Sequence, residues 1–257
     1  MNKPIVDLGG RNVLITGASS GLGAHFARAA ARAGAGVALC ARRVDRLEEL
    51  KKEIEAEGGK ATAVAMDVAD EASITNGIAE AAEALGPIMS FIANAGLNVP
   101  SSAMGLSAAD WDKVSDINLR GVFLTAREAA KHMVANGSTE SGQGRIVLTG
   151  SVGSHTVMDH LIAYNTTKAG VLMMGKALAK EWARKGINVN VICPGWIATE
   201  LNEQWLASPA GQELIASFPR KRVMVPQDLE DVTLLLLSDR SRAISGGSFE
   251  MDDAQSL

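Results

Sequence analysis

Short apolar runs alternate along the chain with longer segments in which apolar residues recur at helical spacing. Seven runs are rich in aliphatic residues, and most lack polar residues at alternate positions: 12–16, 36–40, 62–66, 88–93, 145–149, 188–192 and 248–251. Strands that are apolar on both faces are typical of a parallel sheet covered by helices. The pattern therefore predicts seven strands of one buried sheet.

The intervening segments have the lengths of crossover helices, and several begin with Asp or Ser. We expect helices over the ranges 22–33, 44–57, 71–85, 107–135, 164–185 and 226–237. The glycines in positions that end helices are Gly34, Gly58, Gly86, Gly137 and Gly186. This alternation predicts an α/β fold, with a doubly wound seven-stranded parallel sheet and helices on both faces.

A chain of 257 residues has the length of either two small domains or one large α/β domain. No change in composition marks a linker and no repeat of fixed period is visible, so we expect a single domain over 1–257. The one low-complexity stretch, 136–144, predicts an exposed loop without chemistry of its own.

Charge and cysteine content narrow the class of protein. A formal net charge of −4 argues against nucleic acid binding, because that function needs a basic surface. Cys40 and Cys193 each end an apolar run, which predicts two buried, reduced thiols. No stretch approaches the ~20 apolar residues of a membrane span, and the first residues do not resemble a signal peptide. We therefore expect a cytoplasmic protein without a membrane partner.

The glycine-rich stretch "TGASSGLG" lies between the first predicted strand and the first predicted helix. Gly17, Gly21 and Gly23 allow a tight turn and a close approach to a pyrophosphate. The anion would lie at the positive N-terminus of the helix that begins near Leu22. The strand–loop–helix setting favours a dinucleotide site over a plain tight turn.

The only tyrosine of the chain, Tyr164, lies four residues before Lys168. On a helix the two side chains share a face, so the ammonium is expected to lower the pKa of the phenol from about 10 toward neutrality. Tyr164 could then exchange a proton with a carbonyl or alcohol oxygen. Taken alone, such a pair is more often a packing pair. Ser151 favours chemistry, because it follows a strand end and can donate to the same oxygen.

Five further motifs occur in register with a glycine loop of the spacing Gly-x-x-x-Gly-x-Gly. They are "NAG" (94–96), "SDIN" ending at Asn118, "TGS" ending at Ser151, "YNTTK" (164–168) and "PGWIAT" (194–199). From about residue 9 to its end the chain resembles the short-chain dehydrogenase/reductase family. The resemblance implies a single-domain Rossmann fold and a catalytic set formed by Asn118, Ser151, Tyr164 and Lys168. In that set Lys168 also holds the nicotinamide ribose, and Asn118 positions a water that relays protons.

The resemblance also implies a cofactor site. In it Asp67 and Val68 contact the adenine region, Asn94 lies along the cofactor, and Thr199 contacts the nicotinamide carboxamide. The alternative for Thr199 is a plain helix N-cap. The full set assigned to the cofactor is Gly17, Ser19, Ser20, Gly21, Leu22, Gly23, Arg42, Arg43, Asp67, Val68, Asn94, Ala95, Gly96, Tyr164, Lys168, Pro194, Gly195, Ile197 and Thr199.

The end of the second predicted strand selects between the two nicotinamide cofactors. Ala41 stands where an acid would bind the ribose of NAD, and Arg42 and Arg43 follow it. Guanidinium groups suit the 2′-phosphate of NADP(H), so we predict that cofactor, with Arg42 carrying most of the contact and Ser19 or Arg43 assisting. The alternative is a pair of solvated arginines, with Asp45 as a substitute acid.

The resemblance places a substrate lid at about 196–222, most of it after Thr199. Its apolar residues are Leu201, Trp205, Leu206, Leu214 and Phe218. An apolar lid predicts a hydrophobic, bulky ketone or its secondary alcohol as substrate. Two alternatives remain: a 3-oxoacyl-thioester reductase, whose acidic carrier would meet the basic run 220–222, and a non-catalytic NADPH sensor.

The remaining expectations concern metals and assembly. His155 and His160 are five residues apart with no Cys or clustered acid in the neighbouring sequence, so we predict no metal. The resemblance implies a homotetramer in which the helices at 107–135 and 164–185 form an intersubunit bundle. The tail "EMDDAQSL" departs from the family pattern, because it lacks the frequent glycine pair after its acid; in relatives this tail packs at subunit contacts.

Overall fold

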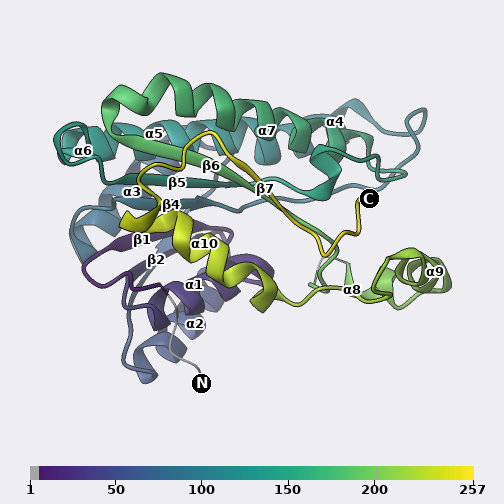
Figure 1. Ribbon diagram of the computed structural model, residues 1–257, viewed down its shortest axis with the longest axis horizontal. Helices are drawn as coiled ribbons and strands as arrows, with labels where there is room; N and C mark the ends of the chain where they lie inside the picture. Colours follow the sequence, from purple (N-terminus) through teal and green to yellow (C-terminus); the bar gives the residue numbers. More distant parts are fainter. Residues whose placement is uncertain (1–5, 201) are drawn as a thin grey trace.

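A computed structural model describes residues 6–200 and 202–257. Its core is a seven-stranded, fully parallel sheet in the order β3-β2-β1-β4-β5-β6-β7 (Figure 1). The strands are β1 (Asn12–Thr16), β2 (Gly36–Ala41), β3 (Lys60–Ala65), β4 (Ser90–Ala93), β5 (Gly144–Thr149), β6 (Ile187–Pro194) and β7 (Ser248–Met251). All seven predicted strands are confirmed, with ends shifted by a few residues.

Helices cover both faces of the sheet, as predicted. On one face α1 (Gly21–Arg32), α2 (Val44–Ala56) and α10 (Glu230–Leu237) bury one apolar cluster. On the other face α3 (Glu71–Leu85), α5 (Gly121–Ala135) and α7 (Ile162–Trp182) bury a second. Figure 1 shows α5 and α7 on one side of the strands and α1 and α10 on the other. The inner strands are therefore apolar on both faces because each face meets helices, whereas the edge strands β3 and β7 are only partly buried.

Two expectations need correction. The predicted helix 107–135 is divided into α4 (Ala108–Ser115), a π-helical turn (Asp116–Arg120) and α5. The stretch 136–144 is not a featureless exposed loop, because it contains the short helix α6 (Ser138–Ser141). Ser138 is fully buried and donates to the Lys185 carbonyl at 2.7 Å. Polarity alone misled the prediction, since this polar side chain finds a backbone acceptor inside the fold.

The sheet order contains a switch point between β1 and β4. From β1 the chain first moves outward through β2 and β3, and it then returns to add β4 on the opposite side of β1. Loops leaving β1 and β4 therefore diverge at their carboxyl ends and open a crevice there. Among the described residues, no helix is long and apolar enough to span a bilayer.

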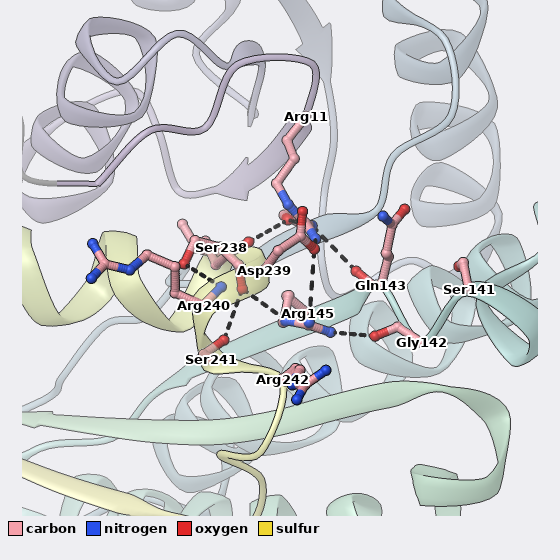
Figure 2. A network of polar contacts seen from close by, with 12 residues as sticks. Arg11, Ser141, Gly142, Gln143, Arg145, Ser238, Asp239, Arg240, Ser241 and Arg242 are labelled. Carbon is pink, nitrogen blue, oxygen red and sulfur yellow. Dashed lines mark hydrogen bonds and ion pairs between the residues drawn. The ribbon is translucent and has the colours of Figure 1, made fainter.

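A polar network at the opposite end of the strands joins distant parts of the chain (Figure 2). Arg145 is almost fully buried and donates to the carbonyls of Ser238, Gly142 and Gly144 at 2.8–3.0 Å. Arg11 pairs with Asp239 and also donates to Ser90. Burial lowers the pKa of Arg145 to about 10, and the nearby Arg11 adds to this effect. The network links β1, β5 and the segment after α10.

Arg145→Ala is expected to lower the free energy of unfolding by about 2–3 kcal/mol. The change leaves three carbonyls without this donor and opens a cavity, although it also removes the cost of burying a charge. Urea denaturation followed by circular dichroism measures the loss. Arg240→Ala is the matched control, because Arg240 is exposed in the same segment and should shift stability by less than about 0.5 kcal/mol. Equal stability of the two variants would contradict a stabilising role for the network.

Candidate active site

A cavity of about 640 Å³ lies in the crevice at the carboxyl ends of the strands. It is lined by the glycine loop, by residues that follow β2 to β6, and by the first turns of α7. Of the residues predicted for the site, all except Gly23 and Asn118 line this cavity. The structure thus brings together side chains that are far apart in the sequence.

The glycine loop is shaped so that backbone, rather than side chains, faces the cavity. Gly17 has a φ of +69°, and a Cβ there would lie 2.9 Å from the Ala95 Cα. Gly23 packs even closer, since a Cβ would lie 2.3 Å from the Gly17 carbonyl oxygen. The N-cap of α1, Ser20, makes no side-chain cap, which leaves the first N–H groups of the helix available to an anion. The loop therefore fits a pyrophosphate.

Thr16 fixes this loop to the end of β4 and was missed by the sequence analysis. Its hydroxyl accepts from the backbone N–H groups of Asn94 and Ala95 at 3.1 and 3.2 Å. The Asn94 side chain returns a hydrogen bond to the Thr16 carbonyl at 3.1 Å. The sequence did contain a signal for this role, because Thr16 is a polar residue at the end of an otherwise apolar strand.

Ser151, Tyr164 and Lys168 converge on one wall of the cavity. Ser151 follows β5 and caps a short 3₁₀ turn, where its hydroxyl accepts from the Gly153 N–H at 3.0 Å. The Lys168 ammonium lies 5.5 Å from the centroid of the Tyr164 ring and donates to the Thr149 carbonyl at 2.7 Å. Because Tyr164 and Lys168 are one turn apart on α7, the helix aligns them as predicted.

The electrostatics of this group differ from the expectation that Lys168 lowers the pKa of Tyr164. Burial raises the pKa of the Tyr164 phenol, and a hydrogen bond with Ser151 opposes that rise only in part. Burial also lowers the pKa of Lys168 to about 8. The cost of removing a phenolate from water outweighs the neighbouring ammonium, which is directed at a backbone carbonyl. In this state Tyr164 therefore holds its proton.

Asn118 lies beside the cavity, in the π-helical turn, and is fully buried. Its carboxamide accepts from the Leu97 N–H at 2.9 Å and donates to the Leu97 carbonyl at 2.8 Å. The reciprocal pair fixes the segment after Asn94 against the π-helical turn. The side chain thus shapes the cavity wall from behind.

The two arginines after β2 take different positions. Arg43 donates to the hydroxyls of Ser19 and Ser20 at 2.7–3.2 Å and so lies along the glycine loop. Arg42, expected to carry most of the phosphate contact, also lines the cavity; it lies 4.0 Å from Asp67 and is largely exposed. Glu200 lies 3.9 Å from Arg43 and accepts from Arg46 at 2.9 Å. The sequence analysis missed both Arg46 and Glu200, which only the fold brings to this end of the cavity.

The segment after β6 closes the other end. Trp196 stacks on Trp205 with ring centroids 5.2 Å apart, and the Met224 N–H donates to the Trp196 carbonyl. Two short helices follow, α8 (Glu203–Leu206) and α9 (Pro209–Ser217). Leu201, predicted as a lid residue, lies outside the described residues. Leu206 and Phe218 are buried, whereas Trp205 is partly exposed.

Two details of this segment revise the alternatives raised by the sequence. Thr199 is not a helix N-cap, because α8 begins after Asn202, whose side chain accepts from the Thr199 N–H at 2.9 Å. The basic run 220–222 is exposed to solvent, but two of its charges have partners within the chain. Arg220 and Arg222 each pair with Asp253 at 2.9 Å, which reduces the charge available to an acidic partner.

Comparison with known proteins assigns the chain to a family. The model of the short chain dehydrogenase family matches residues 11–210. The chain is 32% identical to gluconate 5-dehydrogenase of Gluconobacter oxydans, over 98% of this chain and 97% of that protein. It is 33% identical to D-threitol dehydrogenase of Mycolicibacterium smegmatis, over 97% and 94%.

A crystal structure of a gluconate 5-dehydrogenase from Burkholderia cenocepacia, in complex with NADP and tartrate, has the same fold. It matches with a TM-score of 0.91 at 31% identity, over 97% of this chain and 96% of that one. Sequence and structure agree over almost the whole chain, and the cavity carries the family's motifs in order. The chain belongs to the short-chain dehydrogenase family.

Proposed function

We propose that this protein transfers a hydride between NADPH and an uncharged, mainly apolar ketone, or in reverse from the secondary alcohol. The observation that carries the proposal is the convergence of Ser151, Tyr164 and Lys168 on a cavity whose other wall is an uncapped helix N-terminus behind a glycine loop. A nucleotide-binding loop and a proton donor line the same cavity. That pairing suits reversible carbonyl reduction.

The bound nicotinamide supplies the hydride, and the chain supplies the proton. Ser151 donates a hydrogen bond to the carbonyl oxygen and stabilises the negative charge that develops there. Tyr164, which holds its proton in the free protein, transfers it to that oxygen. Lys168 keeps an ammonium charge beside the resulting phenolate and the ribose hydroxyls. A water held near Asn118 returns a proton from solvent, as in the family's scheme.

Residues of the glycine loop and of the strand ends would hold the cofactor. The N–H groups that begin α1 would bind the pyrophosphate, Asp67 and Val68 the adenine, and Ile197 and Thr199 the carboxamide side of the nicotinamide. NADP occupies the related Burkholderia cenocepacia enzyme. Arg43 already lies beside Ser19 at the expected 2′-phosphate position, and it supports the same preference here.

Arg43→Ala is expected to weaken NADPH binding about tenfold or more while leaving NADH binding within about twofold. A charge-assisted contact to phosphate is worth about 1.5–3 kcal/mol and is absent with NADH. Arg42→Ala should also weaken NADPH binding, but by less, because the Arg42 side chain is directed toward Asp67. Cofactor titrations followed by fluorescence measure both. An unchanged NADPH/NADH ratio in both variants would contradict recognition of the phosphate by these arginines.

The charges of the cavity favour an uncharged substrate. Among the described residues that line it, the cations are Arg42, Arg43 and Lys168. The arginines lie at the adenosine end, and Lys168 is buried, donates to the Thr149 carbonyl and is assigned to the nicotinamide ribose. This leaves no cation to bind a substrate carboxylate. The substrate end is mainly apolar, with Val152, Met158, Leu161 and Trp196 in its wall.

Polyols and sugar acids form the second candidate class, because relatives of this chain are named for such substrates. Asn98 is a polar group in the cavity wall that could bind a hydroxyl. The 3-oxoacyl-thioester alternative is less well supported, since Arg220 and Arg222 are paired with Asp253. A sensor without turnover is disfavoured by the complete catalytic group.

One substrate panel tests these classes. Purified protein with NADPH is offered bulky aryl ketones, small ketones, a keto sugar acid, a keto polyol and an acetoacetyl thioester, and loss of NADPH absorbance is followed. We expect the highest kcat/KM with an uncharged apolar ketone. Preference for the sugar acid or the thioester would contradict the substrate class. Tight NADPH binding without any turnover would contradict catalysis.

We also propose that residues 196–222 act as a substrate lid and that the chain forms a homotetramer. Large apolar side chains remain exposed on the helices expected at the intersubunit bundle: Trp111, Phe123, Ile162 and Met173. Exposed apolar residues on adjacent helices are typical of association surfaces. Light scattering coupled to size-exclusion chromatography measures the assembly, and a monomer would contradict it.

A further inference from the structure

A second cluster of reactive side chains lies behind the catalytic wall. Cys193 of β6 and Glu250 of β7 are register partners in adjacent parallel strands, so their side chains project from the same face of the sheet. His155, just after the 3₁₀ turn that Ser151 begins, reaches the same place. The sequence analysis found no Cys or acid beside His155, and that premise is wrong in three dimensions.

The potential ligand atoms of these three residues all lie within 4.8 Å of one another. The His155 Nε2 is 2.8 Å from the Glu250 carboxylate. The Ser248 hydroxyl lies close to two of the three residues, 3.8 Å from the Cys193 sulfur and 3.5 Å from the His155 Nε2. A tetrahedral ion with ordinary Zn²⁺ bond lengths holds its ligand atoms about 3.4–3.6 Å apart. Small side-chain rotations therefore convert the cluster into a coordination shell.

We infer that His155, Cys193 and Glu250 form a binding site for a thiophilic divalent cation of the Zn²⁺ type. One sulfur, one imidazole nitrogen and one carboxylate oxygen match the ligand preference of Zn²⁺, whereas Mg²⁺ and Ca²⁺ prefer oxygen alone. Three protein ligands leave a fourth position for water or for the Ser248 hydroxyl. The bound thiol would release its proton to solvent as the ion enters.

The surroundings fit such an ion. Cys193 is buried, so its sulfur offers a partly dry position, while His155 and Glu250 are partly exposed and provide a route from solvent. None of the three ligands lines the cofactor cavity. Cys193 nevertheless lies directly behind Ser151, so the two sites share a wall. The test below measures ion binding rather than turnover, and its outcome is therefore independent of the proposed function.

Cobalt is the probe, because a Co²⁺–thiolate bond absorbs in the near ultraviolet. Tag-free, reduced, full-length protein is titrated with Co²⁺ after removal of trace metals. We expect a thiolate-to-cobalt band that saturates at one ion per chain and disappears when Zn²⁺ is added. The band should be lost in Cys193→Ser. His155→Gln and Glu250→Gln, which alter partly exposed side chains, should each weaken Co²⁺ binding about tenfold or more.

Matched controls are available within the chain. Cys40→Ser removes the other buried thiol, and His160→Gln removes a histidine five residues away, so both should retain the band and its stoichiometry. The circular dichroism melt of each variant shows whether it is folded. Absence of a band in wild type at millimolar Co²⁺ would overturn the inference. So would a band that survives in Cys193→Ser, or equal binding by wild type, His155→Gln and Glu250→Gln.

Discussion

Tyr164→Phe is expected to reduce kcat by at least about a thousandfold and to leave the dissociation constant for NADPH within about threefold. The phenol hydroxyl beside Ser151 is the proposed proton donor, and general acid catalysis commonly contributes 10²–10⁴ in rate. Phenylalanine keeps the ring against Lys168 but supplies no proton. Steady-state reduction of the best ketone measures the loss, and NADPH fluorescence measures cofactor binding.

Thr166→Ala is the matched control for Tyr164→Phe, because Thr166 is exposed two residues further along α7. It should keep wild-type kcat. A Tyr164→Phe enzyme with more than a tenth of wild-type activity would show that another group supplies the proton. Loss of NADPH binding in that variant would assign Tyr164 to the cofactor rather than to proton transfer.

Lys168→Met is expected to abolish turnover and, at neutral pH, to raise the free energy of unfolding by about 1–2 kcal/mol. A pKa that falls from the ordinary 10.5 to about 8 corresponds to a cost of about 3 kcal/mol for burying the ammonium. Methionine removes that cost and keeps most of the packing, but loses the hydrogen bond to Thr149. If both effects are seen, the proposed catalytic role of Lys168 comes at the expense of stability.

The same pKa fixes the sign of a pH effect. Between about pH 8 and 10.5 the unfolded chain keeps the Lys168 proton while the folded chain has lost it, so this group makes the wild type more stable as the pH rises. The advantage of Lys168→Met should therefore be largest below pH 8 and shrink above it. Urea denaturation of both proteins at pH 7 and pH 9.5 measures the difference.

Lys176→Met provides the control for burial, since Lys176 is exposed two turns further along α7. It should change stability by less than about 0.5 kcal/mol at either pH. If Lys168→Met were less stable than wild type at pH 7, the buried ammonium would have to be held by stronger interactions than its bond to Thr149.

The sequence was most informative where one local rule acts alone. Apolar runs located every strand, because both faces of a parallel sheet are buried, and Gly17 and Gly23 located the nucleotide loop because no larger residue fits. Tyr164 and Lys168 were paired correctly by helix geometry. The direction of the Tyr164 pKa shift was not predicted correctly, because it is set by burial, and burial depends on the surrounding fold rather than on spacing.

What the sequence could not supply were contacts between distant segments. Glu200 meets Arg43 and Arg46 across more than 150 residues, and Cys193 meets Glu250 only through the pairing of β6 with β7. The π-helical turn before α5 also escaped detection, since a single inserted residue hardly changes the apolar periodicity. The first two misses arose from tertiary packing, and the third from a local change in helix geometry.

The Arg11–Asp239 pair has a consequence for how the chain is made. These residues are 228 positions apart, and Arg145 reaches the same segment through the Ser238 carbonyl. During synthesis from the N-terminus, β1 and β5 exist long before the acid and the carbonyl that their arginines need. Until the segment after α10 is made, Arg11 lacks its carboxylate partner, and Arg145 has only the acceptors near its own strand. We expect the last step of folding to be the docking of that segment, and nascent chains that end before it to depend on chaperones.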